Sequence, residues 1–417
     1  MTRRLVAAIG GVVFAAAMAA AGMTSMTSFA ANAAVPVTAV PALSALSGIT
    51  PAVGVHAAAA VAPRPRLGSA LPDRIAGADR YDTAAKIAAQ FGPAGTVVVA
   101  NGSTEKQGFD ALSANFLAGV VGAPILLTGG ASLPSATAAS IKSVLQGSSG
   151  SGYQVLVMGK ADSVSDAVVA QINAIVQALA GDKVNHVVRV AGSSRYDTAV
   201  AAATFNGDDP TGHWVGSYTI GDGSTLGKTA FLVSGASNAD ALAAGPISNA
   251  LRIPVYLTPA DALPVSVAGA LMSQGIKNLI VLGGGDRVPD AVVAQAKAAG
   301  VATSVRIAGG DRYETASKLY DFARSTLADS GGAHYGSAGP SPVFLANGTV
   351  GFPDALAVGP LAAQGRAALL TTAAETLPPA AAAFLTKYAS SVSGVTALGQ
   401  EATVSAAVLA AAKAVVG

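Results

Sequence analysis

The chain of 417 residues is long enough for two or three domains, and its 51% hydrophobic residues would give each domain a core, which excludes extensive disorder. The formal net charge is only +2, so the strong positive field expected of a protein that binds nucleic acid or an acidic membrane is absent. The sequence contains no cysteine, which excludes disulfides, thiolate metal sites and cysteine nucleophiles.

The first residues, 1–33, have the layout of a signal peptide. Two arginines form a basic start, an apolar run continues to about Ala21, and small residues surround Ala33. We expect cleavage after Ala33, with Ala30 as the alternative; an uncleaved membrane anchor is the competing interpretation, because the apolar run approaches the length that spans a bilayer. Residues 34–70 are mostly Ala, Val and Pro, which predicts a linker. No second long apolar run occurs, so we expect no transmembrane segment in the mature chain.

The rest of the chain contains an internal repeat. An opening motif occurs three times, as RIAGADRYDTA from Arg74, RVAGSSRYDTA from Arg189 and RIAGGDRYETA from Arg306. Three more blocks follow each motif in the same order: an Asp-Ala-Leu block, a PILLT-like block and a closing block such as VLVMGKAD or LIVLGGGD. We therefore predict three repeats, with bounds at 71–188, 189–305 and 306–417.

The copies differ chiefly by insertions between the first and second blocks. These insertions fall near 207–229 and 329–341, whereas the spacing from the second to the third block hardly changes. Constant spacing predicts a rigid unit of secondary structure. The first insertion contains His213, Trp214 and Tyr218, which makes it the better candidate surface for a protein partner.

Short β-branched runs bounded by glycine alternate with alanine-rich segments in each copy. Unbroken apolar runs of this length are typical of strands buried on both faces of a parallel sheet. Strands that alternate with helices form βαβ units, so the expected fold class is α/β, with each repeat a small parallel-sheet domain. In the first copy we predict strands at 96–99, 124–127 and 155–158 and helices at 82–90, 110–120 and 134–145.

Part of the opening motif is explained by helix capping. An N-cap side chain accepts hydrogen bonds from free backbone N–H groups, and an acidic residue three positions later can reach back to the cap. The three predicted pairs of cap and acidic residue are Asp79 with Asp82, Ser194 with Asp197, and Asp311 with Glu314.

Capping does not require the arginines of the motif. One interpretation is structural: the guanidinium groups pair with the repeated aspartates Asp110, Asp240 and Asp354, or join one copy to the next. The other is that they bind carboxylate or phosphate groups of a ligand, for which the guanidinium geometry is suited. The candidate ligand-binding arginines are Arg74, Arg80, Arg189, Arg195, Arg306 and Arg312.

On the basis of these repeated blocks, the chain resembles the cell wall binding repeat 2 family of Gram-positive bacteria from about residue 74 to 417. The resemblance implies a pseudo-threefold arrangement of α/β repeats that holds a surface protein non-covalently to an anionic wall polymer. It also implies that an Ile-Leu-Leu run matters for anchoring; this run falls on Ile125, Leu126 and Leu127, and the other copies depart from it. A buried central strand is the alternative explanation of these three residues.

Catalytic signatures are missing from the sequence. The four histidines lie outside the repeated blocks, and no HExxH, GxSxG or P-loop pattern occurs. We therefore expect no enzyme, no cofactor and no metal site. The predicted function is non-covalent attachment of a secreted protein to the cell wall through an anionic wall polymer, with peptidoglycan as another possible ligand and no nucleic-acid partner.

Two other functions stay open. A surface adhesin or lattice component would bind other surface proteins through the insertions, and a wall-modifying hydrolase is the less favoured alternative. The end of the chain carries one further prediction: only 18 residues follow Gly399, against 30 from Gly159 to Arg189, so the third copy should lack the strand that would lead into a fourth.

Overall fold

The computed structural model describes residues 71–417, except 104–107, 150–151, 181–183, 206–216, 220–224, 329–331 and 350–351. The predicted signal peptide and linker, 1–33 and 34–70, lie outside the described residues, as does most of the insertion near 207–229. Within the described part of the chain, no helix is both long enough and apolar enough to cross a membrane.

The first sheet confirms the predicted parallel arrangement. All its neighbouring strands are parallel, in the order β3-β2-β4-β5, which requires crossover helices between them. Its strands are β2 (Thr96–Asn101), β3 (Ile125–Thr128), β4 (Gly152–Met158) and β5 (Val184–Val190). The helices of this part are α2 (Arg80–Phe91), α3 (Phe109–Val121), α4 (Ser135–Gln146) and α5 (Asp166–Ala180).

The second sheet repeats this order as β8-β7-β9-β10 and gains one antiparallel strand, β6, beside β7. Its strands are β6 (Ser217–Thr219), β7 (Thr225–Ser234), β8 (Val255–Thr258), β9 (Ile276–Leu282) and β10 (Thr303–Ile307). The helices are α6 (Arg195–Ala203), α7 (Ala244–Leu251), α8 (Val265–Ser273) and α9 (Asp290–Ala298). The extra strand β6 lies within the predicted insertion near 207–229.

The third sheet has the order β12-β11-β13-β1, again fully parallel. Its strands are β11 (Ser341–Asn347), β12 (Ala368–Thr372), β13 (Val392–Leu398) and β1 (Arg74–Ile75). The helical segments are α10 (Arg312–Thr326), α11 (Pro353–Leu356), α12 (Gly359–Gln364), α13 (Pro379–Tyr388), the short 3₁₀ helix η3 (Ala389–Ser391) and α14 (Ala406–Val416).

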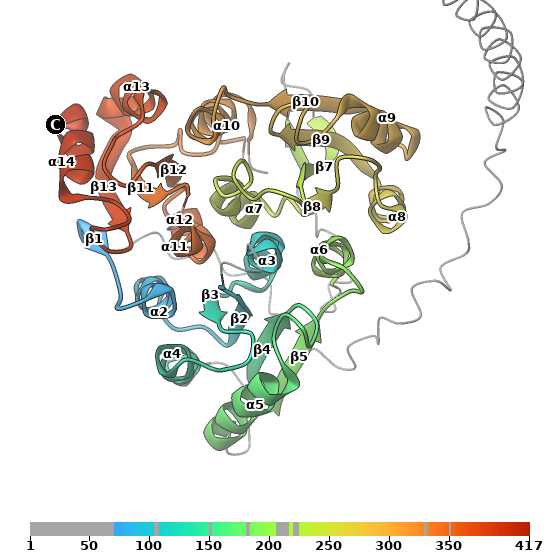
Figure 1. Ribbon diagram of the computed structural model, residues 1–417, viewed down its shortest axis with the longest axis vertical. Helices are drawn as coiled ribbons and strands as arrows, with labels where there is room; N and C mark the ends of the chain where they lie inside the picture. Colours follow the sequence, from blue (N-terminus) through green and yellow to red (C-terminus); the bar gives the residue numbers. More distant parts are fainter. Residues whose placement is uncertain are drawn as a thin grey trace, which may run out of the picture. The chain divides into compact units, whose positions relative to one another are not determined.

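Each opening motif completes the sheet of the preceding repeat. Strands β5 and β10 carry Arg189 and Arg306, and both pair with the last strand of the copy before them. No strand follows β13 in the described part of the third copy, and the start of the first copy takes that place. Arg74 and Ile75 of β1 pair with Ala397 and Leu398 of β13, so the repeats close on themselves (Figure 1).

Three helices from different repeats, α3, α7 and α12, pack against one another (Figure 1). The Asp-Ala-Leu block places Asn115, Gly245 and Gly359 at the same repeat position, and these residues meet: a Cβ on Gly359 would lie 2.8 Å from Asn115 Cγ and 3.2 Å from the carbonyl carbon of Gly245. Four residues further along α3, Gly119 faces the backbone of Asn249 in α7. Small residues let these helices approach closely enough to join the three repeats.

Candidate functional site

The opening motif forms a tight turn between a strand of one sheet and a helix of the next. The backbone N–H of Gly77 donates to Thr83 Oγ1 at 3.0 Å, and the same bond joins Gly192 to Thr198 and Gly309 to Thr315. A Cβ on Gly77 would overlap the backbone of Asp82 and Thr83, so this position needs glycine because of close approach. The Gly and Thr of the motif are therefore structural.

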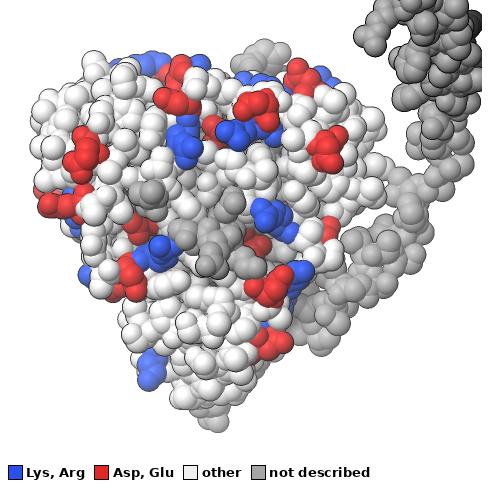
Figure 2. Space-filling view, viewed as in Figure 1, with Lys and Arg blue, Asp and Glu red and all other residues white. Residues whose placement is uncertain are grey.

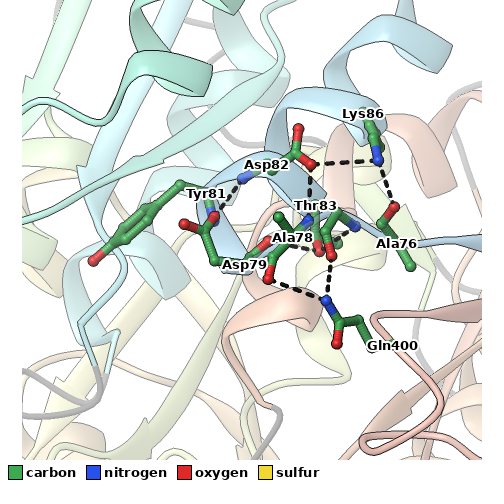
Figure 3. Close-up of polar contacts among 9 residues, drawn as sticks. Ala76, Ala78, Asp79, Tyr81, Asp82, Thr83, Lys86 and Gln400 are labelled. Carbon is green, nitrogen blue, oxygen red and sulfur yellow. Dashed lines mark hydrogen bonds and ion pairs between the residues drawn. The ribbon is translucent and has the colours of Figure 1, made fainter.

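The predicted caps are present. Asp79 Oδ1 accepts from the backbone N–H groups of Tyr81 and Asp82 at 2.9 and 2.8 Å, as Figure 3 shows. Asp82 reaches back one residue beyond the cap that the sequence suggests, because its Oδ2 accepts from the N–H of Ala78 at 2.8 Å. This backbone hydrogen bond is the main reason why the pKa of Asp82 lies below its ordinary value.

The equivalent acidic residues in the other copies act similarly. Glu314 accepts from the N–H of Gly310, and this bond holds its pKa below the ordinary value. Asp197 accepts from the hydroxyls of Ser193 and Ser194. The acidic residues of the motif are thus occupied with the turn and with helix capping.

The first arginine of each motif fixes the closing loop of the preceding repeat. Arg74 donates to the carbonyl oxygens of Gly399 and Val404 at 2.8 and 2.7 Å, although more than 300 residues separate them in sequence. Arg189 and Arg306 donate to the equivalent glycines, Gly159 and Gly283, at 2.7 and 2.8 Å.

An ion pair accompanies these bonds in two of the three copies. Arg189 pairs with Asp166 and Arg306 with Asp290, each at 2.7 Å, while Ala406 takes the equivalent place opposite Arg74. The interpretation that arginines join one copy to the next therefore describes this set of arginines.

The second arginine of each motif lies at the carboxyl edge of the sheet, which is where parallel α/β sheets place their ligands. Arg80, Arg195 and Arg312 each donate from Nη1 to a glycine carbonyl oxygen, in the loops after β2, β7 and β11 respectively, at 3.1, 2.7 and 2.5 Å. Among the described residues, none of the three forms an ion pair. In this respect they differ from Arg189 and Arg306.

In each copy the repeated aspartate lies beside the closing glycine. A Cβ on Gly283 would lie 2.8 Å from Asp240 Oδ2, and one on Gly399 would lie 3.0 Å from Asp354 Cγ. These glycines have φ of 97° and 83°, so conformation and space both favour glycine. In the first copy, Ser163 donates to Asp110 Oδ2 at 2.7 Å.

Asp354 is 7% exposed, and its burial raises the pKa to about 6. A hydrogen bond with Thr83 and the positive charge of Arg80 oppose this rise, and neighbouring Asp79 adds to it. Asp354 belongs to the third copy while Thr83 and Arg80 belong to the first. This carboxyl group is therefore part of the seam that closes the chain, which sequence analysis did not identify.

The residues Ile125, Leu126 and Leu127 form strand β3, and each is 0% exposed. Leu126 faces one hydrophobic cluster and Ile125 and Leu127 face another, as expected for a strand covered on both sides. Their side chains do not contact solvent in this conformation, and their position supports the sheet edge on which the candidate arginines lie.

Figure 2 shows positive and negative side chains interspersed over a largely uncharged face. No group of three or more potential metal-ligating side chains occurs within the described residues. The side chains His213 and Trp214 of the first insertion lie outside them.

Three parallel α/β units that share their edge strands and close on themselves define a protein built of tandem repeats. The family model for cell wall binding domain 2 (CWB2) matches residues 74–169, 189–293 and 306–409. The chain therefore belongs to the CWB2 family with three tandem copies, which confirms the resemblance inferred from its motifs. It is a cell-wall-binding protein.

Known proteins share this region. N-acetylmuramoyl-L-alanine amidase LytC of Bacillus subtilis (strain 168) is 26% identical over 307 residues, covering 73% of this chain and 51% of LytC. Solved structures of Cwp8 and Cwp6 from Clostridium difficile are each 22% identical, with TM-scores of 0.64 and 0.62 over 84% and 82% of this chain; the match covers 52% of Cwp8 and 47% of Cwp6. The chain thus spans about half the length of these relatives, and the two structures share its fold.

Proposed function

We propose that the chain attaches non-covalently to the cell wall by binding an anionic wall polymer, and that Arg80, Arg195 and Arg312 supply the main contacts. One observation carries this proposal: each of these guanidinium groups lies at a sheet edge without an ion-pair partner among the described residues. Guanidinium groups form strong charge-assisted hydrogen bonds with phosphate and carboxylate. Arg74, Arg189 and Arg306 hold the loops around them, and Ile125, Leu126 and Leu127 form the sheet beneath.

The proposal is tested by retention of the whole chain on purified wall sacculi. Retention should fall with rising salt and should disappear after the accessory anionic polymers are removed with acid. Replacing all three arginines, Arg80, Arg195 and Arg312, by glutamine in one variant should abolish the salt-sensitive retention, since a hydrogen bond from a guanidinium group contributes about 1.5–3 kcal/mol where its partner is an anionic group of the polymer. Full retention on stripped peptidoglycan would contradict an anionic polymer as the ligand.

A matched control separates binding from stability. The arginines Arg189 and Arg306 are already paired with Asp166 and Asp290, so their replacement should lower the melting temperature more than it lowers retention per folded molecule. We further propose that the described repeats attach without catalysis. LytC is named an amidase, so release of free amines or reducing ends from the sacculi is the assay that would contradict this.

A further inference from the structure

The seam between the first and third repeats contains an open surface pocket with a volume of about 190 Å³. On the same measure one water molecule needs only about 10–15 Å³, so the pocket has room for a ligand much larger than water. The turn before α2 and the loop after β13 both contribute to it. Its polar lining residues are Asp79, Arg80, Thr83, Asp354, Gln400 and Thr403.

Hydrogen-bond acceptors predominate in this seam pocket. Gln400 Nε2 donates to the carbonyl oxygens of Gly77 and Ala78 at 2.8 and 3.0 Å, and Figure 3 shows the side chain reaching the start of α2. These bonds hold the amide in place, and its Oε1 has no hydrogen-bond partner within the described part of the chain. Asp79 accepts both capping bonds through Oδ1, and its Oδ2 has no partner among the described residues.

The charges of the seam pocket do not favour an anion. Two carboxyl groups, Asp79 and Asp354, accompany the single guanidinium group of Arg80. A phosphate or carboxylate placed here would face both acids. Sugar hydroxyl groups suit this lining better, because each hydroxyl can donate to a carboxylate or amide oxygen and accept from a guanidinium N–H.

The corresponding position at the junction of the first and second repeats is built differently. Lys160 replaces Gln400 and pairs at 3.4 Å with Asp162, which replaces Ala402. Phe109 takes the place of Pro353, and the guanidinium group of Arg195 lies 4.3 Å from its ring centroid.

At the junction of the second and third repeats, Gly284 replaces Gln400 and therefore offers no side chain there. Asp286 and Arg287 stand in the same loop and pair with each other at 3.3 Å. The uncharged Gln400 and Ala402 are thus particular to the seam that closes the chain.

We infer that this seam pocket binds the hydroxyl groups of an uncharged sugar unit, through Gln400 Oε1, the carboxylate of Asp79 and the guanidinium group of Arg80. The inference rests on the proposed function, because it takes this sugar to be a unit of the wall polymer. The three junctions then bind different parts of the polymer: Arg80 contacts a neutral sugar unit, and Arg195 and Arg312 contact the anionic groups.

Saturation-transfer difference NMR on the whole chain tests this inference with neutral sugars as probes: glucose, galactose and N-acetylglucosamine. The informative variant is Gln400→Lys, which copies Lys160 and can still donate to the carbonyl oxygens of Gly77 and Ala78. The second variant is Ala402→Asp, which copies Asp162 on an exposed position. The matched control is Lys160→Gln at the equivalent position of the first repeat.

At least one neutral sugar should give a transfer signal with the unchanged chain. Gln400→Lys should weaken its binding about two- to tenfold, the effect of losing one neutral hydrogen bond, while Lys160→Gln should leave it unchanged. Inorganic phosphate should not displace the sugar. Absence of signal from all three sugars, an undiminished signal in Gln400→Lys and Ala402→Asp, or displacement by phosphate would each overturn the inference.

The sacculus assay and the sugar-binding assay test the two proposals independently. If the chain is retained on sacculi but gives no sugar signal, the proposed function stands and the sugar-binding pocket is contradicted. Conversely, if the chain binds a sugar at Gln400 but is not retained on sacculi, the sugar-binding pocket stands and the proposed wall attachment is contradicted. Within the retention assay, Arg80→Gln should reduce retention without changing its salt dependence, whereas Arg195→Gln should reduce both.

Discussion

Replacing Gly119 with alanine tests the close packing that joins the repeats. Gly119 lies inside α3, and an added Cβ would meet the backbone of Asn249 in α7, with the Cα and carbonyl carbon both at 2.9 Å. Backbone atoms cannot rotate away as a side chain can, so α3 and α7 must separate. Overpacking of this kind costs about 1–3 kcal/mol, which exceeds the roughly 1 kcal/mol that alanine contributes over glycine inside a helix.

Gly269→Ala is the matched control, because Gly269 lies inside α8 with no other atom within 4 Å of an added Cβ. This control should raise the free energy of unfolding by about 0.5–1 kcal/mol. Urea unfolding measures both changes, and an unchanged m value shows that the shift in midpoint reports stability. If Gly119→Ala is as stable as Gly269→Ala, then α3 and α7 do not approach each other as described.

Two further predictions concern the seam. Asp354 has a pKa of about 6 in the folded protein against an ordinary value of 3.8, so the folded state holds this proton more tightly than the unfolded state does. The free energy of unfolding therefore falls as pH rises from about 4 to 6, and above pH 6 this contribution of Asp354 is fully lost. At ~1.36 kcal/mol per pH unit, the free energy of unfolding of Asp354→Asn should rise by up to about 3 kcal/mol relative to that of the unchanged chain between pH 4 and 7, as measured by urea unfolding. If the difference in unfolding free energy between the two chains does not change with pH, Asp354 is not a buried acid with a raised pKa. Arg74→Gln should lower the melting temperature through loss of charge-assisted bonds to Gly399 and Val404, at about 1.5–3 kcal/mol each, and a melting temperature equal to that of the unchanged chain would show that the seam is open in solution.

Much of the fold follows from local patterns in the sequence. The apolar runs at 96–99 and 155–158 became strands, and Asp79 caps its helix, because burial on both faces and free N–H groups at a helix start are local requirements. The three-copy organisation was evident from the order of the blocks.

Closure of the chain could not be predicted in the same way. Strand β1 contains only Arg74 and Ile75, so no periodicity identifies it as the partner of β13. Gln400 likewise carries no repeat signal, because Lys160 and Gly284 occupy its place in the other copies. Both features depend on tertiary contacts between the two ends of the described region.

The different roles of the repeated arginines could not be predicted from the sequence. Their recurrence marked all six as candidates, yet only the structure separates Arg189 and Arg306, which pair with aspartates, from Arg80, Arg195 and Arg312, which do not among the described residues. A pairing between distant side chains depends on the register of neighbouring strands, which the repeat spacing does not encode.

Retention on wall sacculi, measured before and after acid removal of the anionic polymers, tests the central claim most directly. We predict that the whole chain is retained on intact sacculi, released by salt and not retained on stripped sacculi, and that replacing Arg80, Arg195 and Arg312 with glutamine removes retention while the protein stays folded. Equal retention on stripped sacculi, or full retention of the folded triple variant, would contradict attachment through an anionic polymer.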